Sequence, residues 1–218
     1  MSLTQVPLSG AAAAVVGLAA FGAVALDVGW QVIRHGTVMA HEGAHAVIGS
    51  LLFRNVGGIK LNPDATGGTP MDPGGCLGSI FVSFVGYAGP SLFGLGAARL
   101  IRLGHSVAAL WVTLFLLGIL LAGLSRSHGM ITVILVGGLV YVVGHYAPVG
   151  IQIVAAYAIT WLLLLSGVRR VLEVGALSSD GANLTQLTHL PRVLWFLLWL
   201  AATLAALAVG GSMLVMPT

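Results

Sequence analysis

The sequence is dominated by apolar runs of about 20 residues, which short polar breaks separate from one another. A helix needs about 20 apolar residues to cross a ~30 Å hydrocarbon core, whereas the strands of a membrane barrel alternate over about 10 residues. Only 7% of the residues are charged and 58% are hydrophobic, which leaves too few charges to cover a water-facing surface. The pattern therefore predicts an all-α, polytopic transmembrane helix bundle of about six to seven spans, forming a single domain over residues 1–218.

Seven runs qualify as spans, and they cover residues 11–28, 36–53, 77–98, 107–124, 130–146, 151–168 and 193–215. Because the first ten residues contain no Lys or Arg, we expect the first run to remain as a helix and not to be removed as a signal peptide. With seven spans, six of the nine Lys and Arg residues lie on the side of the N-terminus, and this bias predicts a cytoplasmic N-terminus. These six are Arg54, Lys60, Arg126, Arg169, Arg170 and Arg192, and the other three are Arg34, Arg99 and Arg102.

The remaining composition narrows the classes of site and partner. The net charge is +3, but no basic cluster is dense enough to form a nucleic-acid groove, so we expect no nucleic-acid partner. Cys76 is the single cysteine, which excludes an internal disulfide and a cysteine-based zinc cluster. Residues 54–76 form the longest polar segment. A short strand over 58–62 and a tight Gly-Gly turn within 66–69 predict a hairpin-like loop.

The second apolar run contains His41-Glu42-Gly43-Ala44-His45. On a helix, H-E-x-x-H places both imidazoles on one face, one turn apart, where they can share a zinc ion with the glutamate beside it as a base. Ionisable residues are costly within a membrane and usually line a functional cavity. Counted along the run, His45 lies near the middle of the bilayer, which indicates a metal-dependent reaction inside the membrane.

A catalytic zinc ion takes three protein ligands and keeps one position open, so the motif needs a third ligand. Spacing does not select it. Asp180 stands out because it lies beside Gly181 and Asn183, far from other charges and just before an apolar run. The full set of candidates is Asp27, His35, Asp64, Asp72, His105, His128, His145, Glu173, Asp180 and His189.

Four features in this order resemble the site-2 protease family of intramembrane zinc metalloproteases, and most closely its compact actinobacterial members. They are the H-E-G-A-H helix, the glycine-rich loop after it, Ala88-Gly89-Pro90, and Ser179-Asp180-Gly181. The resemblance implies a zinc cofactor bound by His41, His45 and Asp180, with Glu42 as the catalytic base. It also implies a transmembrane protein substrate, cleavage within the lipid bilayer, and a location in the bacterial inner membrane.

Two alternatives stay open at this point: a membrane metal-binding or transport protein, and a catalytically inactive protease-like scaffold. With seven spans, the H-E-x-x-H run and Asp180 approach from opposite sides of the membrane. They can meet only if residues 175–190 fold back into the bilayer or if the span count is wrong by one. No substrate-binding residue is predicted, although residues 58–69 could pair edge to edge with an unwound substrate strand.

Overall fold

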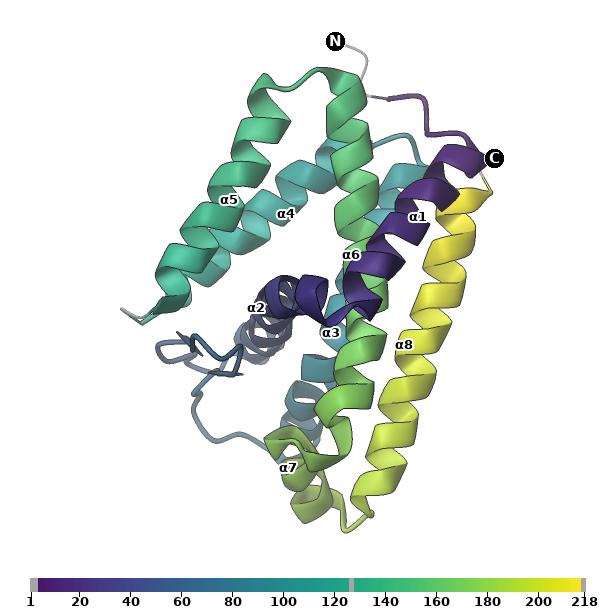
Figure 1. Ribbon diagram of the computed structural model, residues 1–218. Coiled ribbons are helices and arrows are strands. Elements are labelled where there is room, and N and C mark those ends of the chain that lie inside the picture. The colour runs from purple at the N-terminus through teal and green to yellow at the C-terminus, as the bar shows by residue number, and fades with distance from the viewer. Residues whose placement is uncertain (1–3, 126–127, 217–218) are drawn as a thin grey trace.

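The structure is a computed structural model that describes residues 4–125 and 128–216. It confirms the predicted all-α bundle (Figure 1). The helices are α1 (Gly10–Ala25), α2 (Asp27–Leu51), α3 (Cys76–Arg102), α4 (Ser106–Gly123), α5 (His128–Tyr146), α6 (Val149–Val174), α7 (Ser179–Thr188) and α8 (Arg192–Val215). The 3₁₀ turn η1 (Gly175–Leu177) joins α6 to α7, and two short strands, β1 (Lys60–Leu61) and β2 (Gly67–Gly68), lie between α2 and α3.

The first two helices do not form two separate spans. Among the described residues, α3, α4, α5, α6 and α8 are each long and apolar enough to cross a membrane. Helices α1 and α2 pass this test only as a pair, which is bent by 97°. The break is at Leu26, whose backbone is extended (φ −81°, ψ 136°). The bundle therefore has up to six spans, and α2 crosses it at about half its height (Figure 1).

Residues 29–35, which the sequence predicts to be a loop, belong to α2 and are helical. The polar residues at the start of α2 were interpreted as a loop, but they have partners on α6 and belong to the helix. The Arg169 guanidinium lies 2.8 Å from the Asp27 carboxylate and stacks over the Trp30 ring, 4.7 Å from its centroid. The Trp30 indole N–H in turn donates to the Glu173 carboxylate at 3.2 Å. These contacts with α6 allow α2 to begin with polar residues and still pack against the bundle.

The bent pair places the N-terminal segment at the end of the bundle opposite to α7 (Figure 1). The Gln5 backbone N–H donates to the Gly104 carbonyl at 2.7 Å, beside the end of α3 that carries Arg99 and Arg102. The expectation of a cytoplasmic N-terminus depended on counting α1 and α2 as two spans, and they pass the test for a span only together. The same positive-inside rule now favours the cytoplasm for the α7 end. Arg169 and Arg170 lie near the end of α6, which leads into α7, and Arg192 begins α8 directly after it, while Arg54 and Lys60 lie in the segment after α2. Arg126 lies outside the described residues, and Arg34 lies within α2.

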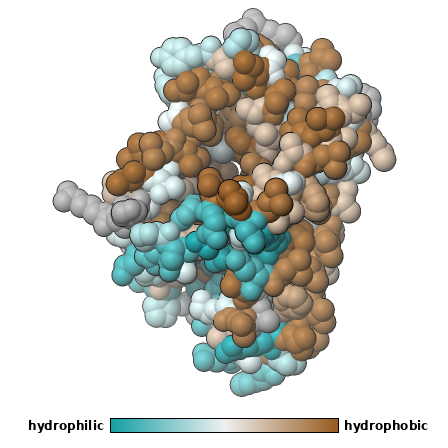
Figure 2. Space-filling view, in the orientation of Figure 1, coloured by the Kyte–Doolittle hydropathy of each residue, from teal (hydrophilic) through white to brown (hydrophobic). Residues whose placement is uncertain are grey.

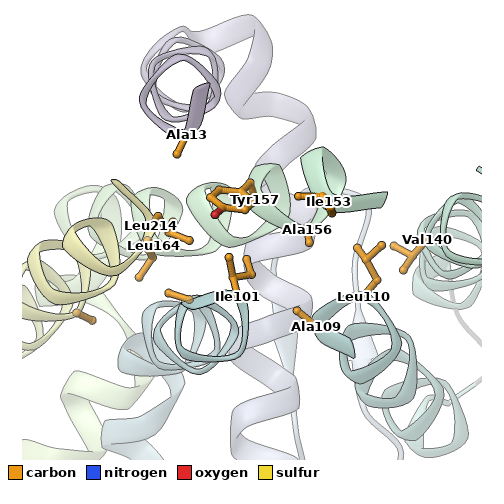
Figure 3. Packing of buried hydrophobic residues seen from close by; sticks show 12 residues of the cluster. Ala13, Ile101, Ala109, Leu110, Val140, Ile153, Ala156, Tyr157, Leu164 and Leu214 are labelled. Carbon is orange, nitrogen blue, oxygen red and sulfur yellow. The ribbon is translucent and has the colours of Figure 1, made fainter. Parts of the chain in front are cut away.

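Helix α6 is the central helix of the bundle and packs against α1, α3, α4 and α8. Figure 3 shows Tyr157 and Leu164 of α6 beside Ile101 of α3, with Leu214 of α8 next to them. Small residues allow this close packing. A Cβ atom on Gly94 would lie 2.9 Å from the Leu164 side chain. These contacts form a rigid frame to which α2 and α7 are attached.

The loop after α2 is a hairpin, as predicted, but its turn is elsewhere. Strands β1 and β2 pair antiparallel, with Lys60 opposite Gly68. The Gly-Gly pair lies in β2, so the predicted Gly-Gly turn is wrong. The chain reverses at residues 62–66, where the Asp64 carboxylate accepts bonds from the Thr66 N–H at 3.0 Å and from its hydroxyl at 2.7 Å. Figure 2 shows hydrophilic residues gathered over the hairpin and the α7 end, while hydrophobic residues cover much of the remaining face.

Candidate metal centre and active site

Three possible metal ligands converge where α2 meets α7. The His41 Nε2 atom lies 3.1 Å from Asp180 Oδ2, the His45 Nε2 atom lies 3.3 Å from it, and the two Nε2 atoms are 3.1 Å apart. Zinc bonds of about 2.0–2.1 Å give a tetrahedral edge of about 3.3 Å. The observed separations therefore fit three corners of a zinc tetrahedron, with a fourth position left for water or substrate. Among the described residues, these three side chains have their ligand atoms close enough together to hold one metal ion.

The orientation of His45 is fixed by a second hydrogen bond. Its Nδ1–H donates to the Val82 carbonyl of α3 at 2.8 Å. The proton on Nδ1 leaves a lone pair on Nε2, the atom that faces His41 and Asp180. The His41 ring packs edge-on against both His45 and Tyr87, with centroid distances of 4.7 Å in each case. Both imidazoles are therefore held by α3 before any metal binds.

Helix α3 approaches α2 closely at two glycines. A Cβ atom on Gly86 would lie 2.5 Å from His45 Nε2 and 2.8 Å from the Cε1 atom of His41. A Cβ atom on Gly89, one turn further on, would overlap the Cβ of Ala44. Small residues three or four apart allow two membrane helices to approach closely. The second glycine belongs to the Ala-Gly-Pro segment noted in the sequence, and Pro90 is accommodated within α3.

Asp180 reaches the histidines because α7 turns back from the end of α6. The N-cap of α7 is Ser178. Its hydroxyl accepts the Gly181 N–H at 3.1 Å and donates to the Gly175 carbonyl at 2.8 Å. The carboxylate therefore lies in the first turn of a helix, where the helix dipole stabilises negative charge. Burial raises the pKa of Asp180, but the two imidazoles within 3.1–3.3 Å of its carboxylate outweigh burial and hold this pKa below its usual range.

A buried aromatic cluster holds α7 against the bundle. Leu184 of α7 and Trp199 of α8 are both fully buried, and Tyr87 packs on the Trp199 ring at a centroid distance of 4.7 Å. The Trp199 indole N–H donates to the Phe84 carbonyl of α3 at 2.8 Å. The same helix α3 therefore positions both the histidines and, through this cluster, the aspartate.

Glu42 lies under the hairpin. Its side chain is buried, and its Oε2 atom accepts a hydrogen bond from the Thr69 hydroxyl at 2.7 Å. A Cβ atom on Gly67 would lie 2.6 Å from Glu42 Oε1, so the glutamate carboxylate occupies the space that a side chain on β2 would fill. This contact accounts for the glycine at position 67, whereas a Cβ on Gly68 would lie in open space.

These groups line one cavity of about 700 Å³. Its wall includes the three possible ligands, Glu42, the segment 67–69 of the hairpin, and Arg170 of α6. Arg170 donates to the Glu173 carboxylate at 3.1 Å and to the Ala65 carbonyl of the hairpin at 3.4 Å. The cavity is large enough for a short stretch of extended peptide beside the possible metal ligands.

The other acidic candidates for a third ligand have different partners. Asp27 pairs with Arg169, Glu173 pairs with Arg170, Asp72 accepts from the Asn55 side chain at 2.6 Å, and Asp64 accepts from Thr66. Among the described residues, none of the remaining histidine candidates belongs to the group at Asp180. The side chain of His128 is not described.

Sequence reasoning did not identify Thr69, Val82, Gly86, Tyr87 or Arg170 as site residues. The one sequence feature near them was the Gly67-Gly68 pair, which precedes Thr69 and was interpreted as a tight turn.

The fold and the site together define a class: a multi-pass integral membrane protein with a metallopeptidase-type H-E-x-x-H helix and a distant aspartate. Comparison with protein families gives the same answer. The model of the Peptidase M50B-like family matches residues 13–210, so the chain belongs to that family, and the resemblance to site-2 proteases is confirmed. At the family level this indicates an intramembrane metalloprotease. No curated protein and no solved structure matches the chain.

Proposed function

We propose that this protein is an intramembrane zinc metalloprotease that hydrolyses peptide bonds of transmembrane protein substrates in a bacterial inner membrane. The proposal rests on one observation above all. Two imidazole nitrogens and a carboxylate oxygen converge at separations of 3.1–3.3 Å beside a buried glutamate, within a bundle of apolar helices. His41, His45 and Asp180 would hold the zinc ion.

When bound, zinc supplies Lewis acidity, which polarises a carbonyl group and makes water easier to deprotonate. The remaining steps belong to the protein. The Glu42 carboxylate accepts a proton from the attacking water and passes it to the leaving amine. Asp180 keeps its negative charge at the site, and the Val82 carbonyl keeps His45 in the tautomer that presents Nε2. Burial of the site beneath the hairpin limits the access of bulk water.

A transmembrane substrate must unwind locally, because the peptide bonds of a helix are shielded by neighbouring turns. The hairpin offers an extended partner for the unwound segment: residues 67–69 line the cavity, while β2 pairs with β1 through its other edge. An unwound segment that pairs with β2 would lie beside Glu42. In this proposal, the backbone of Gly68 and its neighbours would bind the unwound substrate segment.

The test uses the purified protein and a dye-labelled transmembrane peptide of about 20 Leu and Ala residues with a central Gly-Gly pair, which eases unwinding. We expect stoichiometric zinc in the wild type and sharply lower zinc in His45→Ala and Asp180→Ala. Glu42→Gln should retain zinc and lose cleavage. Unchanged zinc in Asp180→Ala would assign the third ligand elsewhere.

Two outcomes would favour the alternatives. Metal transport into vesicles that persists in Glu42→Gln, without cleavage by any variant, would indicate an ion transporter. A wild type that binds zinc but hydrolyses no membrane peptide would indicate a catalytically inactive scaffold.

A further inference from the structure

The hairpin makes a direct contact with the side chain proposed as the base. The Thr69 hydroxyl lies 2.7 Å from Glu42 Oε2 and 3.3 Å from the Glu42 backbone carbonyl. The first distance is that of a short hydrogen bond to a carboxylate, in which the hydroxyl can only be the donor. Thr69 itself is half-buried, and it follows β2 directly in the chain.

Glu42 is confined on its other side by backbone. Its Oε1 atom lies where a Cβ on Gly67 would be placed, so β2 packs directly on the carboxylate. Rotation of the carboxylate away from the site would have to displace either the strand or the Thr69 hydroxyl. The Thr69 hydroxyl and the backbone of Gly67 therefore confine the Glu42 carboxylate from two sides.

The hairpin that carries Thr69 is attached to the bundle at two other points. The Ile59 N–H donates to the Gly123 carbonyl at 2.8 Å, and the Ser125 N–H donates to the Ile59 carbonyl at 3.0 Å, which joins the hairpin to the end of α4. Arg170 donates to the Ala65 carbonyl from α6. Because the hairpin is held on both sides, the position of the Thr69 hydroxyl is set by the frame of the bundle.

We propose that Thr69 is a positioning residue that holds the Glu42 carboxylate in its reactive orientation, so that the hairpin is part of the catalytic apparatus as well as a surface for the substrate. This inference rests on the proposed function. General-base catalysis requires the base to lie within hydrogen-bond reach of the proton that it takes. A glutamate has several rotatable bonds, and a fixed hydroxyl removes that freedom before the substrate arrives.

The experiment compares Thr69→Val, which keeps the shape and removes the hydroxyl, with Thr69→Ser, which keeps the hydroxyl. The same labelled Leu/Ala peptide is the substrate. Thr113→Val is the matched control, because the Thr113 hydroxyl donates to the Ala109 carbonyl of its own helix at 2.8 Å and bonds to no other helix among the described residues. Zinc content and binding of the peptide to the zinc-free protein are measured beside kcat and KM.

For Thr69→Val we expect kcat to fall about 10- to 100-fold, as for a misplaced catalytic group, with KM within about twofold of the wild type. Zinc content and peptide binding should be unchanged, Thr69→Ser should restore most of kcat, and Thr113→Val should match the wild type. A rise in KM with unchanged kcat, or lost peptide binding, would mean that Thr69 serves only the hairpin surface and would overturn the inference.

The two proposals fail in different ways. If the wild type cuts the peptide and Glu42→Gln does not, a Thr69→Val variant with the kcat of the wild type refutes the positioning role alone. If the wild type and Glu42→Gln are equally inactive on every membrane peptide, the protease function itself is refuted.

Discussion

Substitution of Gly86 by alanine should damage the metal site without changing any proposed ligand. The added Cβ would lie 2.5 Å from His45 Nε2 and 2.8 Å from His41 Cε1, whereas ordinary contact begins at 3.4 Å. The shortfall at His45 is therefore about 0.9 Å (3.4 less 2.5). The ring cannot simply rotate away, because its Nδ1–H is bonded to the Val82 carbonyl at 2.8 Å.

The size of the effect follows from the tolerance of metal coordination. Metal–ligand distances are held within about 0.2 Å, so a shift of about 0.9 Å moves a donor well outside the bonding range. Loss of support around a ligand typically lowers metal affinity about 10- to 100-fold, and we expect at least this loss. Overpacking of the contact between α2 and α3 should also cost about 1–3 kcal/mol in stability. Zinc affinity is measured by competition with a chelator, and stability by thermal unfolding in detergent.

Two other glycines of α3 provide the controls. Gly96→Ala places its Cβ in open space and should keep full zinc affinity. Gly89→Ala presses on the Cβ of Ala44 and so separates the helices without touching either imidazole. If Gly86→Ala binds zinc as tightly as Gly96→Ala, the argument that α3 sets the position of the histidines is wrong.

Three further predictions concern the supports of the site. Arg170→Ala should expose the hairpin to limited proteolysis near Ala65, because one of its attachments to α6 is lost; unchanged protection would show that the bond is dispensable. Trp199→Phe removes the donor to the Phe84 carbonyl and should lower the stability by about 1–3 kcal/mol, measured by thermal unfolding; a loss below about 0.5 kcal/mol would indicate that water replaces the bond. Removal of zinc by a chelator should lower the melting temperature of the wild type, as expected for a ligand that binds the folded state, and a curve independent of zinc would count against a metal site.

The part of the site that lies on one helix could be predicted from the sequence. His41 and His45 are four residues apart, and helical periodicity alone places both rings on one face. The hairpin after α2 was also predictable, because glycine, proline and asparagine are concentrated there. Its turn was misplaced because Gly67 serves a tertiary contact with Glu42 and not a local backbone requirement.

The partners of the motif could not be derived in this way. Asp180 is far from the histidines in the chain, and only the resemblance to a family selected it. The bend between α1 and α2 is at Leu26 and contains no proline. The nearest following glycine, Gly29, lies inside α2, so no helix-breaking residue marks the bend in the sequence. Polar residues near the start of α2 are typical of a loop in a membrane protein. Here they are compatible with a helix because their partners are on α6.

The end of α6 connects all parts of the site, which resolves the difficulty raised by counting spans. Arg169 bonds to the elbow between α1 and α2, Arg170 bonds to the hairpin, and Glu173 accepts a bond from α2 at Trp30. The chain then passes through η1 directly into α7, which carries Asp180. The segment 169–180 therefore carries the proposed third ligand. It also braces α2, which carries the histidines and the proposed base, and the hairpin, which contacts that base. The proposed ligands can meet, although they are far apart in sequence, because α2 turns across the bundle to meet this segment.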